Sequence, residues 1–285
     1  MPTGRLAVSM LGLALLTFTS CAATGPYTFG TGRAELDDGL YPEMDEQFLY
    51  GEPNEFLDAS DWFWPGSLLG KLILWDKNVD AHEISPETVA EMKRYIERND
   101  LRDVQVLVNR YDPGLQWDRL TENEAVAPGW RYTFGALSVL VYTILPGRFF
   151  GGDHYNPYTN TVSLYSDDGS IALHEAGHAK DFSSREDKGT HAFLYMLPFA
   201  PLYYESNATR DALSYLALEG DAERLADGYD ILYPAYGTYV AGIAGAVGGH
   251  VVGAGKAGDA PEEVDTLGAS SDDEPAQDDP SRGVL

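Results

Sequence analysis

Two histidines four residues apart, His174 and His178, place the tightest constraint on how this chain folds. Residues at positions i and i+4 lie on one face of an α-helix, so both imidazole rings point to the same side. Their ring nitrogens can then reach one metal ion at about 2.0–2.1 Å. The surrounding residues from Ile171 to Phe182 include many apolar and small side chains, which is typical of a buried helix. We therefore expect a metal-binding helix in this part of the chain.

Glu175 lies between the two histidines and completes the pattern His-Glu-x-x-His. One step round the helix, its carboxylate can take a proton from a metal-bound water. This pattern resembles that of the HExxH zinc metallopeptidases, and the resemblance covers roughly residues 150–225. It implies Zn²⁺ as cofactor, a peptide or protein as substrate, and Glu175 as the general base of peptide-bond hydrolysis. It also implies a zincin-like α+β fold, mostly helical, in which an edge strand over 161–165 precedes the active-site helix.

The third metal ligand has two candidates. The metzincin extension is absent, because Asp181 and Ser184 stand where that pattern has glycine and histidine. Gluzincins instead use a glutamate from a later helix, and both Glu205 and Glu219 open a Glu-x-x-Ala element. We prefer Glu205, since it follows His178 by 27 residues and has small neighbours that allow close packing. Glu219 resembles the Glu-x-Glu-Ala-Asp element of membrane-associated metallopeptidases and is the second choice.

Three further groups can assist such a site. Asp181 is a candidate for the carboxylate that orients a ligating histidine, because such histidines usually donate their other N–H to an acceptor, or for an alternative ligand. A salt bridge from Asp181 to Lys180 or Arg185 is the structural alternative. His154 is a candidate transition-state stabiliser that would polarise a substrate carbonyl. Four tyrosines are open to the same role: Tyr203, Tyr204, Tyr233 and Tyr236.

The first twenty residues have the layout of a signal peptide. Arg5 supplies a positive charge, a short apolar run over 6–18 follows, and Cys21 is the only cysteine of the chain. The run is too short for a stable transmembrane helix. The sequence before Cys21 resembles the lipobox of bacterial lipoproteins, although Phe18 stands where an aliphatic residue is preferred. The resemblance implies lipidation of Cys21 and a place in the cell envelope, anchored to the outer membrane; an ordinary secretory signal is the alternative.

Acidic residues dominate the charge, with a formal net charge of −26. So negative a chain is not expected to bind nucleic acid, which requires a cationic surface. The acids concentrate in two flanks, which carry −9 over 31–62 and −7 over 256–285. We predict a signal peptide over 1–20, an acidic tether over 21–61, a metallopeptidase domain over 62–255 and a disordered tail over 256–285.

Several segments of the domain have readable patterns. Ser85 followed by proline predicts the start of a helix that runs to about Arg98. The alternation over 103–110 predicts a strand, and the apolar stretch over 130–145 predicts a buried helix. Small residues recur at every fourth position over 237–253, a spacing that lets two helices approach closely. For 233–255 we prefer a buried or interface-lying helix to a membrane span.

These observations favour a zinc-dependent peptidase of the bacterial cell envelope. Two alternatives stay open. The first is a non-catalytic envelope lipoprotein whose zinc site is structural or vestigial, in which case four protein ligands would close the site. The second is a membrane-embedded quality-control peptidase, which would need the glycine-rich helix to cross the bilayer.

Overall fold

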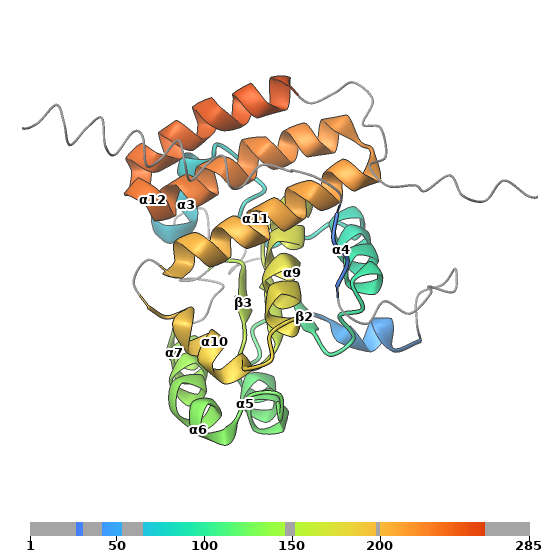
Figure 1. The fold of residues 1–285 in the computed structure, drawn as a ribbon, viewed down its shortest axis with the longest axis vertical. Helices are drawn as coiled ribbons and strands as arrows, with labels where there is room; N and C mark the ends of the chain where they lie inside the picture. The colour runs from blue at the N-terminus through green and yellow to red at the C-terminus, as the bar shows by residue number, and fades with distance from the viewer. Residues whose placement is uncertain (1–26, 31–41, 53–64, 146–151, 198–199, 260–285) are drawn as a thin grey trace, which may run out of the picture.

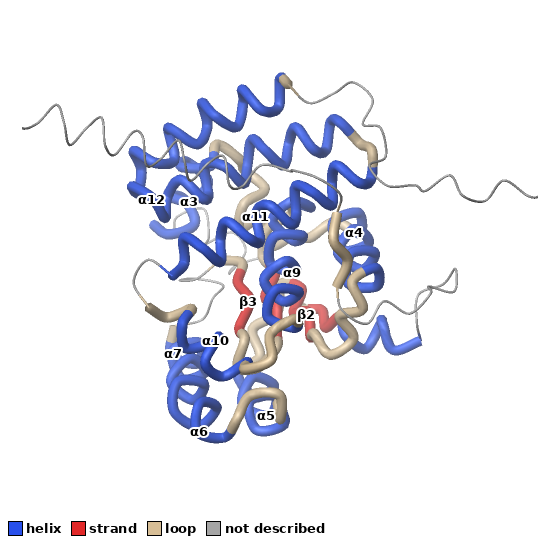
Figure 2. Tube along the Cα trace, viewed as in Figure 1, coloured by secondary structure: helices blue, strands red, loops and turns tan. Residues whose placement is uncertain are grey.

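The computed structural model of the chain describes residues 27–30, 42–52, 65–145, 152–197 and 200–259. Its fold is α+β and mostly helical, with one small mixed sheet (Figures 1 and 2). The strands are β1 (Phe48–Tyr50), β2 (Gln105–Val108), β3 (His154–Asn156) and β4 (Thr161–Leu164). The helices are η1 (Pro42–Gln47), α3 (Pro65–Leu74), α4 (Pro86–Arg98), α5 (Pro113–Glu122), α6 (Pro128–Trp130), η3 (Arg131–Gly135), α7 (Ala136–Ile144), α9 (Gly169–Ser183), α10 (Lys188–Leu194), α11 (Ala200–Glu219) and α12 (Ala222–Gly258). The predicted fold class is thus confirmed at this level.

The four strands are ordered β1-β2-β4-β3. The pairs β1–β2 and β2–β4 are parallel, whereas β3 runs antiparallel to β4. The strand that leads into α9 is therefore β4, as expected, but its predicted position at the sheet edge is wrong. The edge beside it is β3, because the hairpin formed by these two strands places β4 inside the sheet. All four residues of β4 are buried.

Part of the predicted acidic tether over 21–61 belongs to the folded domain. Residues 42–50 form η1 and β1, and their side chains Met44 and Phe48 are buried in the core. Further upstream, the Tyr27 hydroxyl donates hydrogen bonds to Asn99 and Asp211. The predicted domain boundary at residue 62 is therefore wrong. A three-residue strand with one buried phenylalanine does not stand out from the acid-rich sequence around it. Residues 1–26, 31–41 and 53–61 lie outside the described residues, and with them the predicted signal peptide and Cys21.

The helix predicted from Ser85 is confirmed as α4, and the Ser85 hydroxyl accepts a hydrogen bond from the Thr88 amide. The strand predicted over 103–110 is found as β2. The apolar stretch over 130–145 is helical, as α6, η3 and α7, but the expectation that it is buried is wrong. Only one side of α7 packs inward, through Val139 and Tyr142, while Ile144 is 65% exposed.

The glycine-rich segment folds back on itself within α12. The chain reverses at Gly242, whose φ of +57° is readily accessible only to glycine. Figure 1 shows the two antiparallel arms that result, coloured orange and red. A Cβ added at Gly237 would lie 2.2 Å from the Gly245 carbonyl oxygen, so the arms pack backbone to backbone. The small-residue stripe therefore joins two arms of one chain. No helix of the described segments is long and apolar enough to cross a membrane.

Candidate metal centre

The helix α9 follows β4 after a short loop that ends in the capping residue Asp168. The Asp168 side chain accepts a hydrogen bond from the Ile171 amide at 2.9 Å and so caps the first turn. Buried apolar side chains fix the inward face of the helix, among them Leu173, Ala176 and Ala179. The helix packs on β3 and β4 and is flanked by α4 and α11. This packing fixes the orientation of the side chains on its remaining face.

Close contact between α9 and α11 brings the third group within reach. A Cβ added at Gly177 would lie 3.3 Å from the carbonyl oxygen of Ala208, so the two helices approach at small residues. Glu205 lies one helical turn before Ala208 and is buried, with 7% of its surface exposed. Its carboxylate therefore faces the two histidines of α9, as the preferred ligand assignment requires.

Three side chains converge: His174, His178 and Glu205. The Nε2 atom of His174 lies 3.0 Å from Glu205 Oε2 and 3.1 Å from the Nε2 atom of His178. The Nε2 atom of His178 lies 3.4 Å from Glu205 Oε1. In a tetrahedral zinc site with bonds of about 2.0–2.1 Å, neighbouring ligand atoms lie about 3.4 Å apart. The trio therefore has the donor set and the spacing of one face of such a site.

A second layer of hydroxyl groups orients the two imidazole rings. The Tyr195 hydroxyl is hydrogen-bonded to His178 Nδ1, and the Thr209 hydroxyl lies 3.4 Å from His174 Nδ1. An Nδ1–H that donates to these oxygens leaves the Nε2 lone pair directed at the shared position. Neither hydroxyl is predictable from a local sequence pattern, because both contacts depend on how α10 and α11 pack on α9.

The electrostatics of the cluster favour a cation. Although burial by itself acts in the opposite direction, the nearby His178 and His174 hold the pKa of the Glu205 carboxyl well below its usual range. The pKa of His178 is raised by Glu205, against the effect of burial. Burial raises the pKa of Glu175 to about 7, and the neighbouring histidines limit that rise. An anionic Glu205 beside two imidazoles is thus available to a metal ion, and Glu175 can exchange a proton near neutral pH.

The other predicted site residues are paired with groups outside the trio. Glu219 is paired with Arg98 and lies 14 residues beyond Glu205 in α11, which corresponds to about 21 Å along the helix. Asp181 contacts Arg185 and His191, so of its two predicted roles the structure shows the salt bridge. His154 begins the edge strand β3, where its Nδ1 lies 3.0 Å from the Gly152 carbonyl oxygen.

Of the tyrosines near the site, some pack in the core and one lies close to Glu205. Tyr233 is fully buried, and Tyr236 is 3% exposed. Tyr204 stacks on Tyr195 and contacts His191, so it packs against α10 and the residue that follows it. Tyr239, which sequence reasoning missed, is half-exposed, and the negative charge of Glu205 raises its pKa. Its closeness to Glu205 depends on how α12 packs on α11, which no local sequence pattern predicts.

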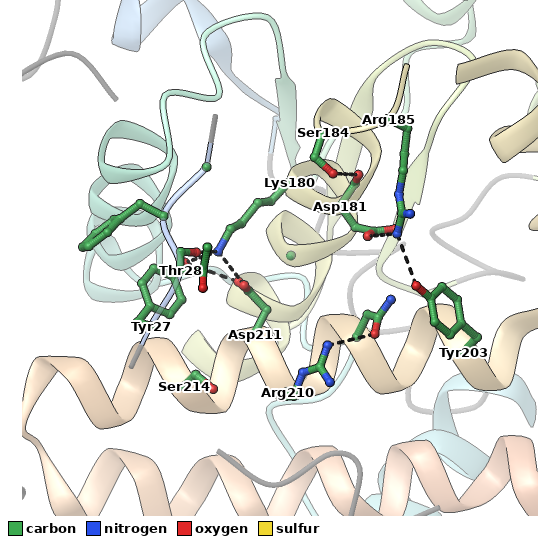
Figure 3. Close-up of a pocket in the computed structure, with 14 residues that line it drawn as sticks. Tyr27, Thr28, Lys180, Asp181, Ser184, Arg185, Tyr203, Arg210, Asp211 and Ser214 are labelled. Carbon is green, nitrogen blue, oxygen red and sulfur yellow. Dashed lines mark hydrogen bonds and ion pairs between the residues drawn. The ribbon is translucent and has the colours of Figure 1, made fainter. Parts of the chain in front are cut away.

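A polar groove of about 510 Å³ lies between α9 and α11 (Figure 3). The segment 27–30 forms one of its walls. Four of its charged side chains form ion pairs, Lys180 with Asp211 and Asp181 with Arg185, and Arg210 donates a hydrogen bond to Asn207. None of the three converging residues lines it, so we assign this groove to the packing of the two helices.

Comparison with known proteins adds no assignment to this geometry. No family model, no curated protein and no solved structure matches the chain.

Proposed function

We propose that this chain is a zinc-dependent peptidase with a zincin-like domain, in which His174, His178 and Glu205 hold the metal. The observation that carries the proposal is the convergence of these three side chains, whose donor atoms lie within 4.8 Å of one another. Two imidazoles and a carboxylate form a donor set that suits zinc. The proposal thus extends the HExxH resemblance to the ligand from α11.

A bound zinc ion supplies Lewis acidity, which lowers the pKa of water and polarises a carbonyl group. Glu175 accepts the proton of the attacking water at its carboxylate and then delivers it to the leaving amine nitrogen. A base is most effective when its pKa lies near the working pH, and in the metal-free protein burial raises the pKa of Glu175. Tyr195 and Thr209 hold the histidine rings in place through their Nδ1 atoms.

The proposed setting is the bacterial cell envelope. The lipobox-like sequence before Cys21 supports a lipid-anchored protein, with the outer membrane as its location and a peptide or protein as its substrate. The groups that converge on the site within the described residues number three, namely two histidines and one glutamate. Catalytic zinc sites typically use three protein ligands, whereas structural sites use four.

The test compares Glu175→Gln with the wild-type full chain. Both proteins are analysed for zinc, and cleavage of a denatured protein is followed by gel electrophoresis. We expect the variant to keep its zinc and to lose activity by about 10³-fold or more, since it removes the proton acceptor. Glu219→Gln is the matched control and keeps both zinc and activity. Equal cleavage by wild type and Glu175→Gln, or a wild type without zinc, refutes the proposal.

A further inference from the structure

The outward side of the helical run formed by α6, η3 and α7 is apolar. Six large side chains are exposed there: Tyr132 (54%), Leu137 (49%), Leu140 (45%), Val141 (48%), Ile144 (65%) and Leu145 (45%). We call these six residues the α7 face. Their spacing follows the helix period, because Val139 and Tyr142 lie between them and point into the protein. The run thus has two apolar sides, of which only one is covered by the described part of the chain.

Such a face is unusual for a protein surrounded by water. A surface helix normally directs polar and charged side chains outward. Here α7 contains no charged residue at all. Contiguous exposed apolar patches on soluble proteins mark places where another apolar surface binds.

The charge pattern points to a membrane. The chain has 45 acidic residues, yet none lies between Glu124 and Asp153. The one charged residue of α6, η3 and α7 is Arg131, which is 7% exposed and donates a hydrogen bond to the Thr121 carbonyl oxygen at 2.8 Å, so these elements present no exposed charge beside the face. An uncharged apolar stripe with an amphipathic tyrosine at one end complements a phospholipid surface. The acid-rich remainder of the chain would be repelled by anionic lipid.

The dimensions disfavour a second copy of the chain as the occupant. A standard protein interface takes about 20–30 residues from each partner. The α7 face offers six large side chains, each 45–65% exposed. A bilayer accepts a single helix face without a partner of matching shape.

We propose that the α7 face docks on a phospholipid bilayer, with the helix parallel to the membrane plane and its apolar side chains at the headgroup boundary. This docking is independent of the peptidase chemistry and of lipidation at Cys21. It orients the domain by fixing which side of the protein faces the membrane.

The test places an environment-sensitive fluorophore on a single cysteine in the full chain, with Cys21→Ser as the background. Ile144→Cys carries the probe on the α7 face, and Val251→Cys is the matched control on the second arm of α12. These positions are 65% and 71% exposed. Vesicles of phosphatidylethanolamine and phosphatidylglycerol, three to one, carry a quencher attached to the lipid chains. We expect the probe at position 144 to be quenched about twofold or more beyond the probe at position 251.

Equal quenching at both positions, quenching at 251 alone, or no quenching at 144 overturns the proposal. A change in the fluorescence of the probe at position 144 that occurs without lipid and grows with protein concentration also overturns the proposal, because a second copy of the chain then covers the face. A second variant, Leu140→Glu with Ile144→Glu, is expected to lower the vesicle-bound fraction about tenfold. Val247→Glu with Val251→Glu changes it little, and unchanged thermal unfolding confirms that both double variants are folded.

Discussion

The ring of His178 is held by groups that sequence reasoning did not connect with it. Its Nδ1 is hydrogen-bonded to Tyr195, the residue at which α10 ends. The Tyr195 ring in turn stacks on Tyr204 with a centroid separation of 4.3 Å. The direction of the His178 Nε2 lone pair therefore depends on α10, although none of the three proposed ligands comes from that helix.

Tyr195→Phe is expected to weaken zinc binding about 10- to 100-fold, which is the usual cost of removing a partner behind a ligating histidine. The ring stack is kept, so the fold remains intact. Tyr203→Phe is the control, since the Tyr203 hydroxyl is exposed and accepts a hydrogen bond from Arg185 rather than contacting a proposed ligand. Competition with a fluorescent chelator measures both affinities. Equal affinity of Tyr195→Phe and wild type contradicts the orienting role.

At this scale the sequence allowed much of the site to be predicted. The i, i+4 spacing of His174 and His178 dictates a shared helix face, and small neighbours correctly favoured Glu205 over Glu219 as the residue that approaches them. Asp181 and His154 could not be placed in the same way. Their partners, His191 and the Gly152 carbonyl, are set by loop and helix packing that no local pattern encodes.

Among the helices, the hairpin of α12 depends on glycine at specific positions. A Cβ added at Gly249 would lie 2.4 Å from the Tyr233 carbonyl oxygen, whereas one at Gly248 meets nothing within 4 Å. Gly249→Ala should lower the free energy of unfolding by about 1–3 kcal/mol, because the arms must separate. Gly248→Ala should raise it by about 0.5–1 kcal/mol through helix propensity. Urea denaturation measures both, and equal effects would contradict the hairpin.

The start of α4 is tied to the loop before α9 through Asp167. This carboxylate accepts hydrogen bonds from the Ser85 amide at 2.9 Å and from the Thr88 hydroxyl at 2.7 Å. Although burial raises its pKa, the hydrogen bonds from Thr88 and Ser85 hold the pKa of Asp167 below its usual value. The stability that Asp167 contributes is therefore present above the unfolded pKa of about 3.9 and is lost as pH falls through the lower folded value.

Asp167→Asn is accordingly expected to cost about 1 kcal/mol at pH 7, after screening by solvent. The difference from wild type should shrink as the pH is lowered below about 3.9. Urea denaturation at both ends of this range gives the comparison. A difference of the same size at low pH would show that the charge of Asp167 does not contribute.

Elements with strong local signals were predictable, and elements stabilised by distant partners were not. The capping residue Ser85 predicts the start of α4, and the alternation of apolar and polar residues over 103–110 predicts β2. In contrast, β1 is a three-residue strand that exists because Phe48 pairs in register with Val106. The reversal at Gly242 looks like any glycine of a small-residue stripe, so one long helix and a hairpin have the same sequence pattern.

Across the whole molecule, a partly buried polar network joins segments that are far apart in the sequence. Lys180 of α9 is paired with Asp211 of α11, and its Nζ donates to the Tyr27 hydroxyl at 2.9 Å. The Tyr95 hydroxyl of α4 also donates to Asp211. The network thus fixes the segment 27–30 against the same two helices that carry the proposed ligands (Figure 3).

Asp211→Ala should lower the free energy of unfolding by about 3 kcal/mol, since it leaves the largely buried Lys180 without its counter-charge. The control is Asp45→Ala. It breaks the ion pair between Asp45 and Lys93, in which the Asp45 side chain is 87% exposed. Loss of such a surface pair costs about 0.5 kcal/mol or less. Thermal unfolding distinguishes the two, and similar small effects would mean that the network is not a source of stability.

The central claim is that one zinc ion is held jointly by His174, His178 and Glu205. Equilibrium dialysis of the full chain against zinc, followed by elemental analysis, tests it most directly. The account predicts one zinc per chain for wild type and for Glu219→Gln, and loss of most of that zinc in His178→Ala and in Glu205→Gln. A Glu205→Gln variant that keeps its zinc, or a Glu219→Gln variant that loses it, would contradict the account.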